Sequence, residues 1–233
     1  SASVKNRLWI SDSAGADEII DSLKGKEYTV SKVTETTRKN NPQPPFTTSS
    51  MQQAASTSLN FNPKKTMKVA QELYEGVNIK GSGTVGLITY MRTDSVRIAE
   101  EARGAAKAVI AQDFGNDYVG SGYFSNGKKD VQDAHEAIRP SNPSLRPADI
   151  RDSLTNDQYR LYNLIWSRFM ASQMAPAVYD SVSADISCGD CVFRAAGSKI
   201  RFDGYLKVYS LSAADKDKTI PPIDEGEKLN CTG

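Results

Sequence analysis

Residues 154–186 read LTNDQYRLYNLIWSRFMASQMAPAVYDSVSADI, and the spacing of apolar residues changes once inside this stretch. The first part opens in capping-box form at Thr155-Asn156-Asp157-Gln158, which predicts the start of a long helix. Its apolar residues recur at helical spacing and are Leu161, Tyr162, Ile165, Phe169 and Met170. After Pro176 the apolar residues alternate, which predicts a strand. The change near Pro176 separates a helical block from a β-rich part.

Strand patterns lie on both sides of the helical block. Ahead of it, residues 8–10 and 28–33 have strand composition, and a short helix is expected over 12–24, with Asp12 or Ser13 as its cap and Gly25 at its end. A proline-rich linker follows at 38–45. Behind the block, residues 178–186 and 205–211 alternate, and tight turns are expected at Gly189-Asp190 and Asp203-Gly204.

The block between these parts, roughly residues 46–174, has helical patterns. One helix begins at Asn62-Pro63, and another is expected to be capped by Asp94-Ser95 and to run to about Asp113. One face of the earlier helix carries Met67, Ala70, Leu73 and Tyr74. The predicted fold class is therefore α+β, with a helical domain over 46–175 inserted into a β-rich domain made of 1–45 and 176–233.

Composition places the chain among globular proteins and excludes several classes. With 39% hydrophobic and 24% charged residues it is not a disordered chain, and its short apolar runs predict no membrane span and no signal peptide. One histidine, His135, excludes sites that need two, and three cysteines fit a reducing, cytoplasmic setting. The formal charge of +1 lacks the basic excess of a dedicated nucleic-acid binder, although a local site can be basic while the total cancels.

The first candidate site is Gly86-Leu87-Ile88-Thr89-Tyr90-Met91-Arg92-Thr93-Asp94-Ser95. We expect Tyr90 at the end of a short strand, with Arg92 on the same face. The guanidinium of Arg92 could bind phosphate oxygens in a planar fork and stabilise the charge of phosphoryl transfer, which is the help that a phenol nucleophile requires. The helix predicted after Ser95 would add amide donors. A core tyrosine, a surface arginine and a helix cap explain the same residues.

Two further motifs could line such a site. Asp133-Ala134-His135-Glu136-Ala137-Ile138-Arg139-Pro140-Ser141 places the histidine among two acids and an arginine, where a protonated imidazole could hold a phosphate; a solvated polar turn is the alternative. Pro44-Pro45-Phe46-Thr47-Thr48-Ser49-Ser50 crowds hydroxyl groups at a predicted helix start. These hydroxyls could bind a backbone phosphate or simply cap the helix.

Two metal-like patterns are better explained as turns. Cys188-Gly189-Asp190-Cys191 has CxxC spacing, but a zinc ribbon needs a second pair and only Cys231 remains. Asp215-Lys216-Asp217 has DxD spacing inside a lysine-rich loop, which favours a solvated turn. We therefore expect no metal ligands in this chain.

Together these segments resemble the bacterial type IA DNA topoisomerases. The resemblance rests on GLITYMRTDS at 86–95, DAHEAIRPS at 133–141 and residues 154–177, with PPFTTSSMQQAAS at 44–56 ahead of them. It covers about residues 44–180 motif by motif, and the flanking β segments are similar to the arch domain that carries the tyrosine domain in this family. The resemblance implies an isomerase that cleaves and reseals one DNA strand through a 5′-phosphotyrosine link and relaxes negative supercoils.

The resemblance also implies roles for individual residues. Tyr90 matches the nucleophile, and Arg92 matches the arginine that positions the scissile phosphate, so both are predicted to be catalytic. The DNA-binding residues implied by the same motifs are Arg92, Thr93, Asp94, Ser95, His135, Glu136 and Arg139.

In this family Mg²⁺ and the acid–base groups belong to a Toprim domain, which this sequence does not show; a second strand-binding domain is not visible either. We therefore expect a monomeric central fragment that binds single-stranded DNA weakly, contains no Mg²⁺ ligands and cannot relax DNA alone. Between residues 46 and 146 there are twelve Lys and Arg against ten Asp and Glu, which fits weak binding.

Three other functions are consistent with the same residues. A non-catalytic module could bind single-stranded DNA through Arg92, His135 and Arg139 and act only as a gate. A protein-docking domain would have no DNA affinity, and a salt titration of binding would reveal this. A tyrosine recombinase would need several arginines and a second histidine-type residue around its tyrosine, which the single histidine makes a poor fit.

Overall fold

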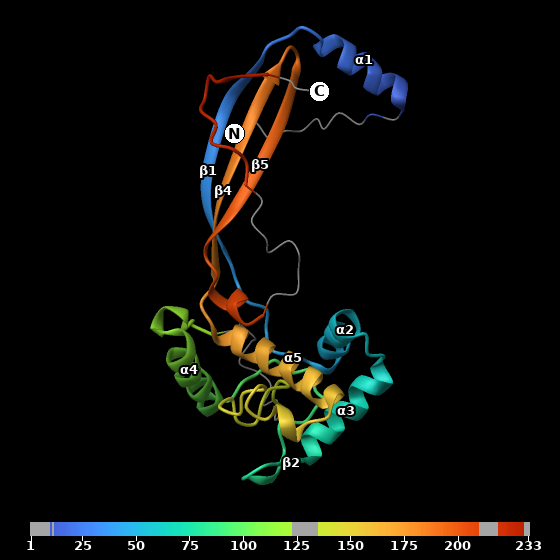
Figure 1. Ribbon diagram of the computed structural model, residues 1–233, viewed down its shortest axis with the longest axis vertical. Helices are drawn as coiled ribbons and strands as arrows, with labels where there is room; N and C mark the ends of the chain where they lie inside the picture. Colours follow the sequence, from blue (N-terminus) through green and yellow to red (C-terminus); the bar gives the residue numbers. More distant parts are fainter. Residues whose placement is uncertain (1–9, 11, 123–134, 210–218, 231–233) are drawn as a thin grey trace. The chain divides into compact units, whose positions relative to one another are not determined.

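The computed structural model describes residue 10 and residues 12–122, 135–209 and 219–230 of the 233-residue chain. Helices and strands are both prominent (Figure 1), so the predicted α+β class is confirmed. The chain divides into two compact units. Unit 1 consists of residues 1–37, 180–199 and 217–233, and unit 2 consists of residues 38–179 and 200–216. In the described residues no helix is both long and apolar enough to cross a membrane.

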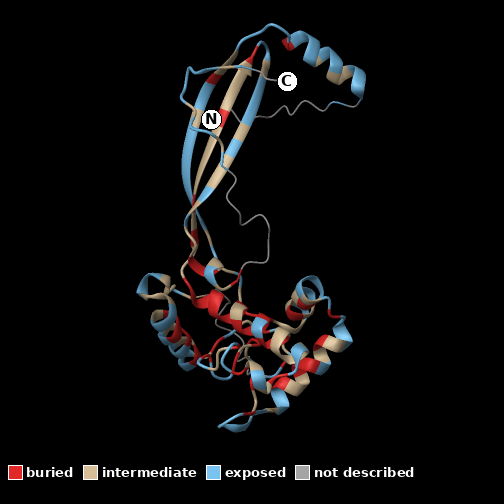
Figure 2. Ribbon diagram, in the orientation of Figure 1, coloured by how far each residue is buried: buried red, intermediate tan, exposed pale blue. Residues whose placement is uncertain are grey.

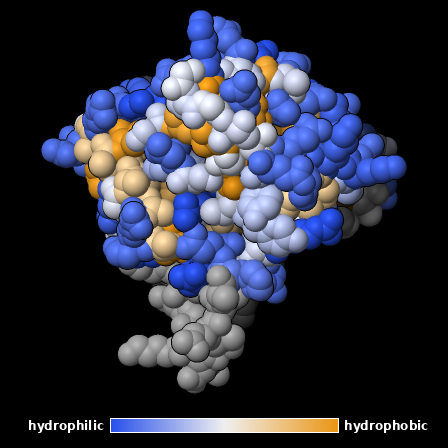
Figure 3. Space-filling model, turned by 90° about the horizontal axis from the view of Figure 1, so that it is seen from below, coloured by the Kyte–Doolittle hydropathy of each residue, from blue (hydrophilic) through white to orange (hydrophobic). Residues whose placement is uncertain are grey.

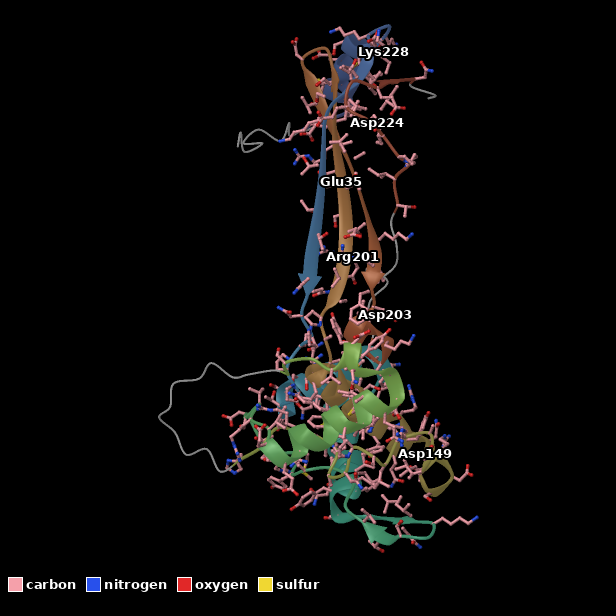
Figure 4. The ribbon with its side chains drawn as sticks, turned by 90° about the vertical axis from the view of Figure 1, so that its left-hand side faces the viewer. Glu35, Asp149, Arg201, Asp203, Asp224 and Lys228 are labelled. Atoms are coloured by element: carbon pink, nitrogen blue, oxygen red, sulfur yellow. The ribbon has the colours of Figure 1, made fainter. Side chains whose placement is uncertain are left out.

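Unit 1 is built on a sheet with the strand order β5-β4-β1-β6. These strands are β1 (Tyr28–Asn40), β4 (Ala177–Cys188), β5 (Cys191–Phe202) and β6 (Lys228–Leu229). Charged side chains such as Glu35 on β1 and Arg201 on β5 are exposed along them (Figure 4). The short strand β6 pairs antiparallel with the start of β1, and the Lys228 ammonium lies 2.9 Å from a carboxylate oxygen of Glu27.

Helix α1 (Ser13–Leu23) confirms the predicted short helix. The carboxylate of Asp12 accepts a hydrogen bond of 2.9 Å from the backbone N–H of Gly15, so Asp12 is the N-cap. Gly25 follows the helix with a φ of +72°, the left-handed conformation expected of a terminating glycine. The strand predicted at 8–10 falls outside the described residues, apart from Ile10.

Strand β1 is longer than the sequence predicts. The prediction of a linker from residue 38 is wrong for 38–40, because these residues still have a strand partner in β4. The Thr37 hydroxyl donates a 2.9 Å hydrogen bond to the Asp180 carboxylate. The Arg38 guanidinium lies 4.9 Å from the centre of the Tyr179 ring. Irregular chain begins only at Asn41, ahead of the prolines.

The turn at Gly189-Asp190 joins β4 to β5 as predicted, but the strand predicted over 205–211 is wrong. Residues Gly204–Lys207 form the 3₁₀ helix η3 instead, and residues 210 and 211 lie outside the described part. Tyr205 and Tyr209 are four positions apart, and both are buried against the core of unit 2. In a strand, residues 205, 207 and 209 would share one face. Here Tyr205 and Tyr209 are buried, whereas Lys207 between them is exposed.

Unit 2 is organised around helix α5 (Asn156–Gln173), most of which is buried (Figure 2). The predicted capping box is confirmed, since Thr155 and Gln158 bond to each other's backbone N–H groups. Three other helices surround the same core: α2 (Thr48–Leu59), α3 (Pro63–Glu75) and α4 (Glu100–Phe114). The fully buried side chains include Phe46, Met51, Leu73, Leu87, Met91, Ile110, Ile138, Leu161, Tyr162 and Phe169.

Smaller elements complete unit 2. Strands β2 (Val77–Ile79) and β3 (Gly83–Val85) form a hairpin, and η1 (Asn116–Tyr118) and η2 (Arg151–Ser153) are single 3₁₀ turns. Figure 3 shows one face of the molecule, on which hydrophilic residues predominate and hydrophobic areas are small and separate. This face therefore resembles an ordinary solvated protein surface.

Two glycines pack closely against the backbone that follows α5. The N–H of Gly120 donates to the carbonyl of Gln173 at 3.0 Å, and a Cβ on Gly120 would lie only 2.2 Å from the Met174 carbonyl oxygen. On Gly204, which has a φ of +50°, a Cβ would lie 2.5 Å from the carbonyl oxygens of Ala175 and Pro176. The backbone packs so closely here that a side chain has no room.

We expect Gly204→Ala to destabilise the protein by about 2–4 kcal/mol, because the new Cβ meets rigid backbone and the φ is unfavourable. Chemical denaturation followed by circular dichroism measures the change. The matched control is Gly104→Ala on α4, where a Cβ meets nothing within 4 Å. That variant should gain about 0.5–1 kcal/mol of helix stability. Equal stabilities for the two variants would contradict the steric argument.

Candidate functional site

The three motifs singled out in the sequence meet in unit 2 through backbone hydrogen bonds. The N–H of Ile138 donates to the carbonyl of Phe46 at 2.8 Å, which joins the second motif to the segment ahead of α2. The N–H of Thr89 donates to the carbonyl of Arg139 at 2.9 Å, which joins the tyrosine motif to the second motif. Segments that are far apart in the sequence thus form one backbone framework.

Thr48, the first residue of α2, ties the helix to the tyrosine motif. Its N–H donates to the carbonyl of Thr93 at 2.9 Å. Its hydroxyl oxygen accepts from the N–H of Thr93 at 2.9 Å and lies 2.8 Å from the carbonyl oxygen of Met91, to which it donates. Thr89 ties the tyrosine motif to the second motif in the same way. Its hydroxyl donates to the carbonyl of Ala137 at 2.7 Å and accepts from the N–H of Arg139 at 3.0 Å. Two threonine hydroxyls therefore fix the tyrosine segment on both sides.

We expect Thr48→Val to destabilise the protein by about 1–3 kcal/mol, because the isosteric side chain leaves the Thr93 N–H without its acceptor. Thermal unfolding measures this loss. Thr57→Val is the matched control, since Thr57 is exposed and its hydroxyl bonds to Gln53 of its own helix, donating to the carbonyl and accepting from the side-chain amide. That control should change stability by less than about 0.5 kcal/mol. A similar, small effect of both variants would show that the threonine junction contributes little.

Tyr90 is an exposed side chain on an irregular segment. It is 44% exposed, and its ring contacts the ring of Tyr74 edge-on, with 5.3 Å between the centroids. The prediction that a strand ends at Tyr90 is wrong, since β3 ends at Val85 and the chain then runs against the end of α3. Gly86 makes that approach possible, because a Cβ there would lie 2.8 Å from the Tyr74 carbonyl oxygen. Tyr74 is predicted to share a helix face with Leu73, which is fully buried, but Tyr74 itself is 41% exposed.

The helix predicted to start at Asp94-Ser95 begins later, at Glu100, with Ala99 as its N-cap. Tertiary pairing explains the delay, because the Arg97 carbonyl accepts a 2.9 Å hydrogen bond from the Ala137 N–H and keeps the segment extended. The buried Ser95 uses its hydroxyl locally, accepting from the Arg97 N–H at 3.2 Å. The first turn of α4 therefore does not follow directly on Ser95, and the helix that begins within the framework is α2.

A shallow pocket of about 450 Å³ opens where the motifs meet. Its lining comes from all three motifs and consists of Thr48, Ser49, Gln52, Arg92, Thr93, Asp94 and His135. Arg92, Asp94 and His135 are exposed there, so a solute can reach the charged groups. Four predicted site residues thus share one pocket, and Tyr90 lies two residues from Arg92 without lining it.

Ser49 belongs to the hydroxyl motif that the sequence singled out, whereas Gln52 is a lining residue to which the sequence assigned no role. They lie three positions apart on α2, and Thr48 and Gln52 lie four apart, so a helix brings all three to one face. That spacing at a predicted helix start was the available signal. The side chain of Ser50, by contrast, is used in a capping box with Thr47.

Glu136 and Arg139 form an ion pair instead of lining the pocket. The Arg139 side chain donates to one Glu136 carboxylate oxygen from Nε at 3.0 Å and from Nη2 at 2.5 Å, and it also donates to the Pro140 carbonyl at 3.0 Å. Both side chains are largely buried. A second arginine, Arg97, lies 3.8 Å from the other carboxylate oxygen. The pair stabilises the segment that follows His135, since it links two residues three positions apart in that segment.

The described residues do not fit a resident Mg²⁺ ion. Mg²⁺ requires several oxygen ligands in near-octahedral geometry. Within the described part of the chain no three His, Cys, Asp or Glu side chains cluster to hold a metal ion, and in the pocket Asp94 is accompanied by His135 alone. The DxD pattern at 215–217 lies outside the described residues. We derive no chemical step through a metal held by this chain.

Comparison with known proteins assigns the chain to a family. A family model described as DNA topoisomerase matches residues 2–233. Full-length topoisomerase I from Thermotoga maritima has the same fold, with a TM-score of 0.80 and 36% sequence identity over 97% of this chain. A DNA topoisomerase is thus the class that fold and site define. The chain belongs to the bacterial type IA DNA topoisomerase family.

The match covers 36% of the Thermotoga chain, so the present chain corresponds to about a third of that enzyme's length.

Proposed function

We propose that this chain carries the nucleophilic tyrosine of an enzyme that cleaves and reseals one DNA strand and thereby relaxes negative supercoils. The observation that carries the proposal is the pocket shared by three motifs, next to an exposed Tyr90. Family membership supports it. We further propose a helical domain over 46–175 inserted into a β-rich arch domain of 1–45 and 176–233, and a cytoplasmic, monomeric protein.

The pocket suits the backbone of a DNA strand. A phosphodiester has one negative charge and several acceptor oxygens, which match a guanidinium fork from Arg92 and neutral donors from Ser49 and Gln52. His135 enters from the opposite segment and adds a further donor. Thr93 and Asp94 complete the lining, and the Glu136–Arg139 pair and Ser95 act by positioning these segments. Single-stranded DNA is therefore the proposed substrate.

Tyr90 is the proposed nucleophile. In cleavage, the phenolic oxygen forms a bond to phosphorus while the bond from phosphorus to the 3′ oxygen breaks. The 3′ oxygen takes up a proton and leaves as a hydroxyl, the phenolic proton is lost, and the 5′ phosphate remains on the tyrosine. Resealing reverses each transfer. Because one phosphodiester replaces another, the cycle needs no external energy source.

Arg92 is the proposed electrophilic partner of this nucleophile. Negative charge on the phosphate oxygens grows in the transition state, and a fixed guanidinium stabilises it more than it stabilises the ground state. The resemblance to the type IA family implies that Mg²⁺ and the acid–base groups come from a Toprim domain. We propose that residues of this chain alone do not complete the cleavage site.

A plasmid relaxation assay with Mg²⁺ tests this division of labour. We expect no relaxation by the 233-residue chain alone, and cleavage of single-stranded DNA once a separate Toprim-containing piece of a family enzyme is added. Robust turnover by the chain alone would refute the proposed dependence on a second domain. Failure of the mixture to cleave, together with intact folding of both pieces, would count against the catalytic role.

A non-catalytic gate is the second candidate, and the open, shallow pocket is the observation that favours it. Fluorescence anisotropy with a labelled oligonucleotide at increasing salt separates the possibilities. Weak, salt-sensitive binding without covalent capture in the mixture would indicate a gate. No binding at any salt concentration would indicate a protein-docking role instead.

A further inference from the structure

The tip of the β4–β5 hairpin holds two free thiols, one on each side of the turn. Cys188 is the last residue of β4 and Cys191 is the first of β5, with only Gly189 and Asp190 between them. Residues that flank a two-residue turn have Cα atoms within about 7 Å, and a disulfide bridges Cα atoms at about 4.4–6.8 Å. Gly189 has a φ of +57°, as two-residue hairpin turns require.

A second pair of residues fixes the register of this hairpin. Asp185 lies three positions before Cys188, and Arg194 lies three positions after Cys191. Their side chains form a two-pronged contact, with Arg194 Nε and Nη2 donating to the two Asp185 oxygens at 2.7 and 2.9 Å. Residues directly opposite in antiparallel strands make such pairs, so Cys188 is also opposite Cys191 and both thiols lie on one face.

The same ion pair makes the stability of the hairpin depend on pH. The Arg194 guanidinium beside Asp185 lowers the pKa of that carboxyl below its ordinary value. Stability from the pair is therefore present above the ordinary carboxyl pKa and is lost as pH falls through the lowered value. At neutral pH the register that aligns the thiols is held.

The two thiols differ in access. Cys188 is fully buried, whereas Cys191 is partly exposed. An external disulfide can therefore reach Cys191, and Cys188 can react only with a sulfur already at the tip. This division matches an attacking and a resolving thiol.

A positive charge lies against the turn. A Cβ on Gly189 would lie 2.7 Å from the ammonium nitrogen of Lys26, so that nitrogen is packed over the Cys-Gly-Asp-Cys turn. In the described residues Lys26 has no ion-pair partner, whereas Lys24 pairs with Asp21 and Lys228 with Glu27. Lys26 also lines a pocket of about 510 Å³, whose charged lining residues are Lys24, Lys26, Lys228 and Glu27. The surroundings of the turn suit a small anionic reagent.

We propose that Cys188 and Cys191 form a redox-active pair that exchanges with low-molecular-weight, carboxylate-bearing disulfides. The Cys191 thiolate attacks one sulfur of the reagent, a protein–reagent S–S bond forms, and one reagent thiol leaves. The Cys188 thiolate then attacks the Cys191 sulfur and expels the second reagent thiol. The protein loses two electrons and two protons, and one reagent disulfide becomes two thiols.

Mass spectrometry of the chain in a Cys231→Ser background tests the pair. With glutathione disulfide as the probe, we expect the mass to fall by two hydrogens and a Cys188–Cys191 cross-linked peptide to appear. Cys188→Ser should stop at a stable glutathione adduct on Cys191. Cys191→Ser should give no adduct while folded. A protein that stays fully reduced, or an adduct on Cys188 as fast as on Cys191, would overturn the proposal.

Lys26→Met tests the role of the charge. We expect exchange with glutathione disulfide to slow several-fold, and exchange with the uncharged hydroxyethyl disulfide to keep its rate, because only the former has carboxylates to attract. Lys199→Met is the matched control, because Lys199 is an exposed lysine of β5 that does not line this pocket, and it should leave both rates unchanged. Equal slowing with both reagents would contradict electrostatic recruitment by Lys26.

Discussion

Tyr90→Phe is expected to abolish covalent capture of single-stranded DNA, by about 10⁴-fold or more, because the ring remains while the attacking oxygen is lost. The measurement uses an end-labelled oligonucleotide, Mg²⁺ and the chain supplemented with a Toprim-containing piece, followed by denaturing electrophoresis. The fold should be unaffected, since the side chain is 44% exposed and its hydroxyl makes no hydrogen bond within the described part of the chain.

Tyr74→Phe is the matched control for that experiment. Tyr74 is a second exposed tyrosine of similar accessibility, in ring contact with Tyr90 at 5.3 Å. We expect it to retain capture within a few-fold, because only an edge-on ring contact is needed and phenylalanine keeps it. If the Tyr90 variant still captures DNA and the Tyr74 variant does not, the wrong tyrosine has been assigned.

Arg92→Ala is expected to lower the cleavage rate by about 10²–10³-fold, since it removes a donor aimed at the charge that develops on the phosphate. Single-turnover cleavage at saturating oligonucleotide measures the rate apart from binding. Arg92→Lys should recover only part of the activity, because an ammonium cannot form the planar fork. The salt dependence of binding should also weaken, by about 0.7 in the slope of log K against log salt.

Lys64→Ala is the control for charge alone. Lys64 is an exposed residue near the start of α3 and does not line the pocket. Its replacement should leave the cleavage rate unchanged. An equal loss from the Lys64 and Arg92 variants would mean that general attraction, and not a fork at the phosphate, accounts for the effect.

Local signals predicted most of the elements correctly. The capping box at Thr155 and Gln158, the Asp12 cap and the Gly189-Asp190 turn are each formed by residues close in sequence, so the pattern contains the interaction that makes the element. The three candidate motifs were also evident, because their residue types carry the chemistry. The resemblance to the type IA family then implied that the three motifs belong to one DNA-binding and cleavage site.

The failures share one cause, which is pairing between distant segments. Nothing near Ser95 indicates that the Arg97 carbonyl will bond to Ala137 and delay the helix to Glu100. The strand predicted over 205–211 failed because residues 204–207 form the 3₁₀ helix η3, and Tyr205 and Tyr209 are buried in the core of unit 2 while Lys207 stays exposed. That the three motifs form one pocket likewise depends on Thr48, whose bonds to Met91 and Thr93 span more than forty positions.

Mapping the covalent adduct by mass spectrometry tests the central proposal most directly. The chain, a Toprim-containing piece, Mg²⁺ and a single-stranded oligonucleotide are mixed, denatured and digested with protease and nuclease. We predict a nucleotide joined through its 5′ phosphate to the peptide that contains Tyr90, and to no other residue of the chain. A 3′-phosphate link, or an adduct on a different residue, would contradict Tyr90 as the nucleophile.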